Sequence, residues 1–281
     1  MTSASTFTDL VATSSTAANA AHHLPEPSER ARRQAEVLAA LRPHVPAHAL
    51  LYQSEDTTPY ECDGLTAYRQ RPLLVCLPET YAQVQAVLQA CHAIGAPVIA
   101  RGAGTGLSGG AMPHPMGVTL SLAKFNKILK VDAYSRTALV QCGVRNLAIS
   151  EAAAPYGLYY APDPSSQIAC TIGGNVAENS GGVHCLKYGL TVHNVLKVKG
   201  FSIEGEPVEF GADALDTPGL DLLAIMIGSE GMLAVVTEVT VKLVPKPQLA
   251  RCIMASFDDV RKAGDAVAAV IAAGIIPAGL E

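Results

Sequence analysis

A short strand that runs directly into a dense cluster of glycines constrains this chain more than any other feature. The apolar run Pro97–Arg101 is followed by Gly102-Ala103-Gly104-Thr105-Gly106-Leu107-Ser108-Gly109-Gly110, which holds five glycines in nine residues. Glycine permits positive φ and carries no Cβ, so successive backbone N–H groups can converge on one anion. No Lys or Arg follows Arg101 within the loop. We therefore expect a diphosphate bound by backbone donors, with the hydroxyls of Thr105 and Ser108 in support.

The spacing Gly104-x-Gly106-x-x-Gly109 also matches the fingerprint of nicotinamide-dependent enzymes. That fingerprint needs a helix directly after the glycines, with its N-terminus on the pyrophosphate. The segment that follows is interrupted by Gly110, Pro113, Pro115 and Gly117. Such residues preclude a regular helix, and no acidic residue for a ribose contact lies within Ala123–Lys130. A nicotinamide dehydrogenase is therefore rejected.

Two further segments combine glycines with small polar side chains. The first comprises Pro162–Gln167, Thr171–Asn175 and Asn179–Gly182. Its hydroxyls and amides offer donors without fixed positive charge, which suits the uracil-like edge and ribityl chain of a flavin. The second is Gly228–Glu238, where Glu230 is open to two interpretations, a solvated turn carboxylate or a ligand contact.

Composition excludes several classes of protein. The chain is 49% hydrophobic and 16% charged, which allows a sizeable core. Its net charge of −5, its lack of Trp and its 5% aromatic content argue against nucleic-acid binding. The seven cysteines are dispersed without a Cys-x-x-Cys pair, which argues against a zinc ribbon or an iron–sulfur cluster and is typical of reduced thiols in a cytosolic protein. We predict no metal site, no secretory signal in residues 1–20 and no transmembrane segment.

Local patterns predict an α+β fold. The expected helices are 29–41, capped by Ser28, a helix that follows Thr80 and stops at Gly95, 145–156 and 258–273. The expected strands are 72–78, 97–101, 118–122, 137–142, 238–243 and 251–257, with a hairpin formed by 195–201 and 207–210. Pro245-Lys246-Pro247 reads as a domain boundary. We expect a disordered tail over 1–27 and a helical segment over 28–66.

The three loops, in this order and spacing, resemble the PCMH-type FAD-binding domain shared by vanillyl-alcohol oxidase and p-cresol methylhydroxylase. The resemblance covers residues 67–247 and implies a domain of two subdomains. It also implies that 250–281 begins an α+β C-terminal cap domain that is cut short here. Within the superfamily, the motifs RGAGTGLSGGA, PDPSSQ, CTIGGNVAENSGG, HCLKYG, GSEG and VTEVTVKL are most similar to the flavin-carrying subunits of glycolate oxidases.

The resemblance implies a set of FAD contacts. The first group, which would cradle the diphosphate, is Arg101, Gly102, Ala103, Gly104, Thr105, Gly106, Leu107, Ser108, Gly109 and Gly110. The second, which would line the flavin and its linker, is Pro162, Asp163, Ser165, Thr171, Gly173, Gly174, Asn175, Asn179, Gly181 and Gly182. The third is Glu230, Gly231 and Val235. No histidine lies within 101–110, so we expect non-covalent FAD. His184 is read first as a pocket or packing residue.

The implied reaction is oxidation of a small 2-hydroxy acid, glycolate first, to the 2-oxo acid, with hydride passing to the flavin. The enzyme would be an FAD-linked (S)- or (R)-2-hydroxy-acid oxidase or dehydrogenase. D-Lactate and D-2-hydroxyglutarate dehydrogenases are the near alternatives, and a non-catalytic assembly subunit is the alternative of another class. No catalytic residue is assigned, since the substrate groups are expected in the cap; a lone His193 or Arg145 is more often structural.

The same resemblance implies partners. These are other glycolate oxidase subunits, namely a flavin-domain paralogue and an iron–sulfur subunit. We expect a cytoplasmic location, with peripheral placement at the inner membrane through those subunits.

Overall fold

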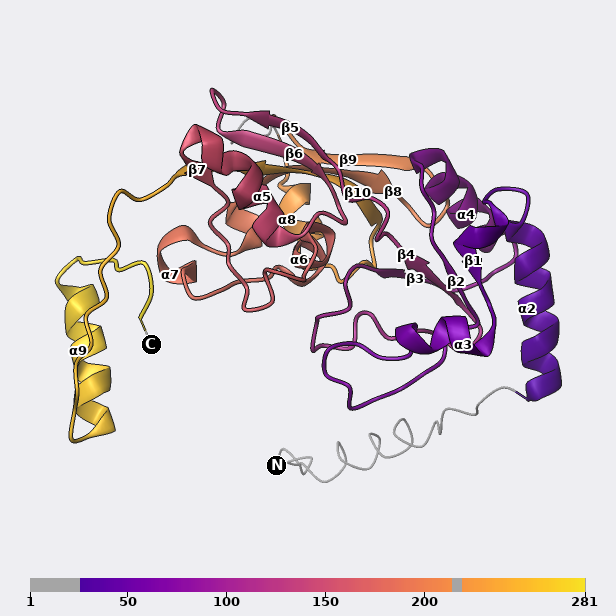
Figure 1. The fold of residues 1–281 in the computed structure, drawn as a ribbon, viewed down its shortest axis with the longest axis horizontal. Coiled ribbons are helices and arrows are strands. Elements are labelled where there is room, and N and C mark those ends of the chain that lie inside the picture. The colour runs from indigo at the N-terminus through magenta and orange to yellow at the C-terminus, as the bar shows by residue number, and fades with distance from the viewer. Residues whose placement is uncertain (1–25, 214–218, 281) are drawn as a thin grey trace, which may run out of the picture.

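The computed structural model describes residues 26–213 and 219–280. They form an α+β fold, as the sequence predicts, with a four-stranded, a five-stranded and a two-stranded sheet (Figure 1). The tail predicted over 1–27 lies almost wholly outside the described residues. Among the helices of the described part, none combines the length and the apolar character needed to cross a membrane.

The helices are α2 (Pro27–Leu41), α3 (Ser54–Thr57), α4 (Tyr81–Ala93), α5 (Asn146–Ala153), α6 (Ile172–Glu178), α7 (Cys185–Tyr188), α8 (Leu222–Met226) and α9 (Val260–Ala272). The strands are β1 (Leu50–Leu51), β2 (Leu74–Cys76), β3 (Val98–Arg101), β4 (Val118–Ser121), β5 (Ile128–Asp132), β6 (Thr137–Gln141), β7 (Leu158–Tyr159), β8 (Val195–Phe201), β9 (Pro207–Gly211), β10 (Val235–Lys242) and β11 (Val244–Pro245).

The first sheet has the order β1-β2-β4-β3, with β2, β4 and β3 parallel. The helix between β2 and β3 is α4, whose N-terminus is closed by a capping box of Thr80 and Gln83. Its buried residues are Val84, Val87, Leu88 and Cys91, a spacing that places them on one face of the helix. These side chains pack against the sheet, and α2 covers α4 from outside. The carboxyl end of β3 therefore leads directly into the glycine cluster at residues 102–110.

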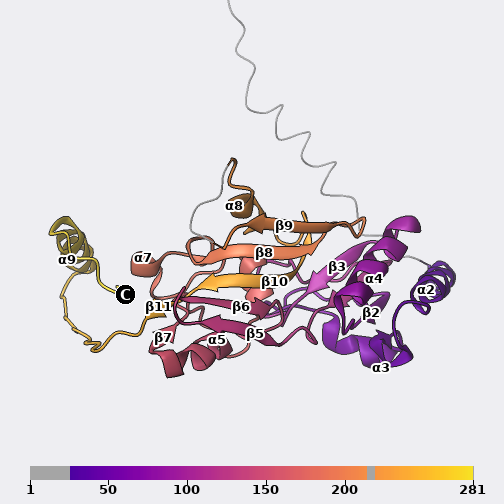
Figure 2. The same ribbon diagram turned by 90° about the horizontal axis from the view of Figure 1, so that it is seen from above.

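The second sheet is antiparallel, in the order β5-β6-β10-β8-β9 (Figure 2). The predicted hairpin is present as β8 and β9. Helices α5, α6 and α8 pack on one face of this sheet (Figure 1). In β10, Val239 and Val241 are fully buried on one face, and Thr240 on the opposite face is 7% exposed. The other residues on the face of Thr240, which are Val236, Glu238 and Lys242, are half-buried.

Three local predictions need correction, and one strand was not predicted. Helix α2 begins at Pro27 with Glu26 as its N-cap residue, not after Ser28, since proline fits the first turn of a helix. Residues 251–257 form no strand and are exposed. Thr171–Asn175, read as loop, is the N-cap residue and the first four residues of helix α6. Strand β5 was not predicted, because its alternation is irregular.

Buried thiols make the fold sensitive to alkali. Burial raises the pKa of Cys76, Cys91 and Cys142 from 9.0 to about 12, with the neighbouring Cys91 adding to the shift at Cys76. In the unfolded chain these thiols lose their protons from about pH 9, whereas the folded chain keeps them until about pH 12. Unfolding therefore releases protons in this window, and the free energy of unfolding falls as pH rises.

We expect urea denaturation to show a steady loss of stability between pH 9 and pH 11, of up to roughly 1.4 kcal/mol per pH unit for each such thiol. The double variant Cys76→Ala/Cys91→Ala starts less stable at pH 7 but should lose less per pH unit. A free energy of unfolding that stays constant from pH 8 to pH 11 would contradict this account.

Candidate functional site

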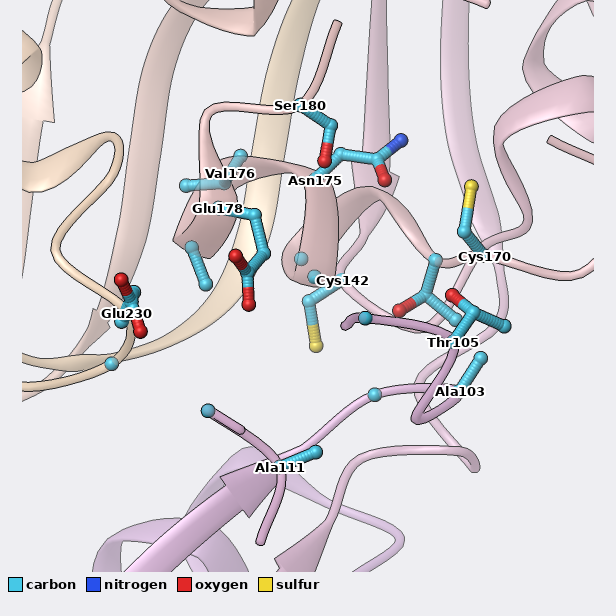
Figure 3. A pocket seen from close by; sticks show the side chains of 18 of the residues that line it. Ala103, Thr105, Ala111, Cys142, Cys170, Asn175, Val176, Glu178, Ser180 and Glu230 are labelled. Atoms are coloured by element: carbon cyan, nitrogen blue, oxygen red, sulfur yellow. The ribbon is translucent and has the colours of Figure 1, made fainter. Parts of the chain in front are cut away.

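One cavity of about 520 Å³ lies between the two sheets. Its walls come from the glycine cluster after β3, from α6 and from the segment that enters β10 (Figure 3). Most of the predicted cofactor contacts line it, namely Arg101, Gly102, Ala103, Gly104, Thr105, Gly106, Leu107, Gly110, Ser165, Thr171, Gly173, Gly174, Asn175, Gly181, Gly182, Glu230, Gly231 and Val235. The structure thus brings together three segments that are far apart in the sequence.

We call the loop over residues 102–110 the glycine loop. The side chain of Arg101 supports it. This side chain is only 7% exposed, and its guanidinium donates to the carbonyls of Ala111 (3.1 Å) and Cys62 (2.9 Å). Burial lowers the pKa of Arg101. Gly104 has φ +70° and lies against the guanidinium, where a Cβ would collide with it. The guanidinium of Arg101 therefore supports the shape of the loop, and its hydrogen bonds go to main-chain carbonyls.

A second support comes from the segment before β2. Asp63, 6% exposed, accepts hydrogen bonds from the N–H groups of Gly109 and Leu65, both at 3.0 Å. The N–H of Gly64 donates to the carbonyl of Gly106 at 3.0 Å. The second half of the glycine loop is thus tied to residues 63–65.

The N-terminal end of α6, which lines the cavity, holds a buried hydroxyl without a hydrogen-bond partner within the described residues. Thr171 is the N-cap residue of α6 and is 8% exposed. Its Oγ1 is buried and has no hydrogen-bond partner within the described residues. A Cβ on Gly102 would collide with this oxygen, and one on Gly174 would lie 3.4 Å from it. Because buried polar groups are normally paired, a hydroxyl left unpaired in a cradle without side chains fits a polar ligand such as a phosphate.

The two glycines of α6 differ in their surroundings. A Cβ on Gly173 would lie 2.7 Å from Cβ of Cys142, and its N–H donates to the Cys142 carbonyl at 2.8 Å. Gly173 therefore lets α6 pack closely on the second sheet. Around a Cβ of Gly174 the structure offers no nearer atom than the Thr171 hydroxyl. Of the pair, Gly174 is the one that leaves room for a ligand.

Five predicted contacts lie beside the cavity wall instead of in it: Ser108, Gly109, Pro162, Asp163 and Asn179. The Ser108 hydroxyl donates to Glu178 at 2.9 Å, and the Gly109 N–H is held by Asp63. The Pro162 carbonyl accepts from Asn146, which in turn accepts from the buried amide of Asn175. Asn179 ends α6 at φ 51° and accepts from the N–H of Val192 at 3.0 Å. In the described structure these predicted contacts hold the segments that form the cavity wall in place and do not line the cavity themselves.

Histidines near the site are engaged elsewhere. Nδ1 of His184 lies 2.5 Å from Oδ2 of Asp163, which ties the loop at 162–166 to the residues that precede α7. His193 accepts from the N–H of Leu190 at 3.1 Å, and Arg145 donates to the carbonyl of Ile168 at 3.3 Å. Within the described residues there is no group of three or more His, Cys, Asp or Glu side chains arranged to hold a metal ion.

Sequence reasoning missed Asp63, Asn146 and Glu178. Glu178 stands between the glycines of α6 and those at 181–182, and its carboxylate projects from its helix into the cavity (Figure 3). Its position directly before Asn179 in the quoted motif was a usable signal. No pattern pointed to Asp63 or Asn146, since their roles depend on contacts with distant segments.

Comparison with known proteins agrees with this geometry. Residues 72–211 match the model of the FAD binding domain family. The chain is 64% identical to the glycolate oxidase subunit GlcD of Escherichia coli (strain K12) over 245 residues, which are 87% of this chain and 49% of that protein. It is 40% identical to the subunit of the same name from Bacillus subtilis (strain 168) over 223 residues, 79% of this chain and 47% of that protein.

A solved structure supports the fold. Alkyldihydroxyacetonephosphate synthase superposes with a TM-score of 0.68 at 23% sequence identity, over 76% of this chain and 41% of that chain. In each case the chain spans about half, or less, of the protein that it matches.

Proposed function

The chain belongs to the FAD binding domain family through residues 72–211, and on that premise we propose that it is the flavin-binding part of an enzyme that oxidises a small 2-hydroxy acid. Glycolate is the proposed substrate and the 2-oxo acid the product. The proposal is supported by the 64% identity to a glycolate oxidase subunit. The single observation that carries the binding role is the unpaired Thr171 hydroxyl in a cradle of glycines.

The residues present fit FAD. The N–H groups of the first half of the glycine loop and the hydroxyl of Thr171 are uncharged donors for a diphosphate. Val235 and Gly231 offer an apolar stretch of wall beside them. No histidine lies within 101–110, which supports a non-covalent complex. When bound, the flavin supplies the hydride acceptor; the chain's residues bind it, orient it and exclude water.

We propose no catalytic residue within this chain. His193 and Arg145 are held by main-chain groups. The proposed organisation is a helical segment over 28–66, the FAD-binding domain over 67–247 and the start of a cap domain over 250–281. The absence of any buried side chain on α9 supports an element that packs against a further part of a longer protein. Figures 1 and 2 both show α9 at the opposite end of the molecule from α2.

The word subunit in the name of the E. coli relative supports an assembly. We propose that the partners are a flavin-domain paralogue and an iron–sulfur subunit, and that these hold the protein in the cytoplasm at the inner membrane.

The test is reconstitution. The purified 281-residue chain should take up one FAD, turn yellow and release the flavin intact on denaturation. Glycolate should not bleach the flavin of this chain, whereas it should bleach that of a chain extended to the full length of its relatives. D-Lactate and D-2-hydroxyglutarate are tested as alternative substrates in the same assay. A well-folded chain that takes up no FAD would refute the binding role. An extended chain that binds FAD but is reduced by none of these acids would indicate an assembly module.

A further inference from the structure

The two ends of α6 give the cavity two polar regions of opposite character. Thr171 caps the N-terminal end and Glu178 is the last residue of the helix. Both line the cavity. Seven residues of helix separate them by about 10 Å at 1.5 Å per residue. A coenzyme that lies along α6 would meet a neutral donor at one end and a carboxylate at the other.

The second half of the glycine loop is poorly suited to a phosphate. The N–H of Gly109 is already taken by the Asp63 carboxylate. The Glu178 carboxylate lies beside Gly106 and Gly110, and it accepts the Ser108 hydroxyl at 2.9 Å. From the position of a Cβ on Gly110, Oε1 of Glu178 is 3.2 Å away and Oε2 of Glu230 is 3.5 Å away. Two carboxylates beside one backbone position repel an added anion.

The nearest cation does not offset this charge. Arg101 is the one Lys or Arg among the residues that line the cavity, and its guanidinium is bound to the carbonyls of Ala111 and Cys62. The acidic region therefore keeps its negative character. Carboxylates without a cation are strong acceptors for hydroxyl groups, and Asp or Glu binds ribose hydroxyls in other dinucleotide sites.

We infer that Glu178, with Glu230 beside it, accepts hydrogen bonds from the sugar hydroxyls of the coenzyme, while the diphosphate lies at the Thr171 end of α6. This inference rests on FAD as the ligand and says which part of it each region binds. The Thr171 hydroxyl, 8% exposed and unpaired in the described part of the chain, is the independent sign of a ligand in the same cavity. The sugar is either the ribose of the adenosine or the ribityl chain of the flavin.

The test is Glu178→Gln, which keeps the shape of the side chain and an acceptor for Ser108 but removes the charge. Titration of the chain with FAD, followed by flavin fluorescence, should show a dissociation constant raised about tenfold, as expected when a charge-assisted hydrogen bond becomes a neutral one. Glu151→Gln, an exposed carboxylate on α5 outside the cavity lining, is the matched control and should bind as the unmodified chain does. Glu230→Gln provides a second test on a separate segment, and circular dichroism confirms that each variant is folded.

Competition by ADP and by 2′-deoxy-ADP identifies the sugar. If the ribose is bound, the affinity of ADP for the Glu178→Gln variant should be about tenfold lower than its affinity for the unmodified chain. The affinity of 2′-deoxy-ADP should fall by less, because it lacks one of the hydroxyls. If the ribityl chain is bound, ADP should compete equally against both chains while FAD still binds more weakly. Unchanged or tighter FAD binding by both folded variants would overturn the inference. A parent chain that takes up no FAD would instead overturn the proposed function.

Discussion

Replacing Gly174 with valine should weaken FAD binding by at least about a hundredfold while leaving the apoprotein folded. The structure offers space for the new side chain, since a Cβ there meets only the Thr171 hydroxyl at 3.4 Å. Valine is at least as good a helix former as glycine, so α6 should persist. What the side chain would occupy is the cradle in which we place the diphosphate. Equilibrium dialysis with FAD measures the loss, and thermal unfolding of the apoprotein measures stability.

Gly264→Val is the matched control for this variant. Gly264 is also helical, it lies on α9, and a Cβ there would meet nothing within 4 Å. FAD affinity should be unchanged. If Gly174→Val retained its full flavin content, the assignment of this end of the cavity would be wrong.

Arg101→Ala should be the most damaging single change to the glycine loop. The variant loses two hydrogen bonds from a buried guanidinium, to Ala111 and to Cys62, as well as the contact of that group with the Tyr60 ring at 5.7 Å. Hydrogen bonds to charged groups contribute roughly 1.5–3 kcal/mol each. We expect a loss of about 3 kcal/mol in the free energy of unfolding, which corresponds to a fall in Tm of roughly 6–12 °C.

The same change should weaken FAD binding, because Gly104 rests against the guanidinium and the loop loses its support. Arg32→Ala, on the exposed side of α2, removes the same group from a surface position and should leave both quantities nearly unchanged. Differential scanning calorimetry and FAD titration of the two variants test this. If Arg101→Ala unfolded at the same temperature as the unmodified chain, the support that Arg101 gives to the glycine loop would be dispensable.

Local chemistry made much of the fold predictable. Thr80 predicted the start of α4, and the turn at Glu204-Gly205-Glu206 between two apolar runs predicted the hairpin of β8 and β9. Helix α6 was missed because Gly173 and Gly174 each lower helix propensity by about 1 kcal/mol relative to alanine. Close packing of Gly173 on Cys142 outweighs that cost. The segment 251–257 has a strand-like composition, but within the described residues no neighbouring strand accepts its hydrogen bonds.

The candidate site was predictable in part. The glycine loop and Thr171 were found because small residues and hydroxyls next to a strand indicate a ligand. Asp63 was not, since its partner Gly109 is 46 residues further along the chain. Glu178 lies directly before Asn179 in the glycine-rich motif, but that position alone does not separate a cavity wall from a solvated helix end. Such roles emerge only from tertiary contacts.

The support that Asp63 and Cys62 give to the glycine loop has a consequence for anyone who wishes to transplant this candidate site. The stretch that matches the family model starts at residue 72, yet the groups that hold both halves of the glycine loop come from residues 62–64. A minimal module excised at residue 72 would carry every glycine and still lack the scaffold that sets their shape. The portable unit therefore begins at least ten residues before the start of the family match.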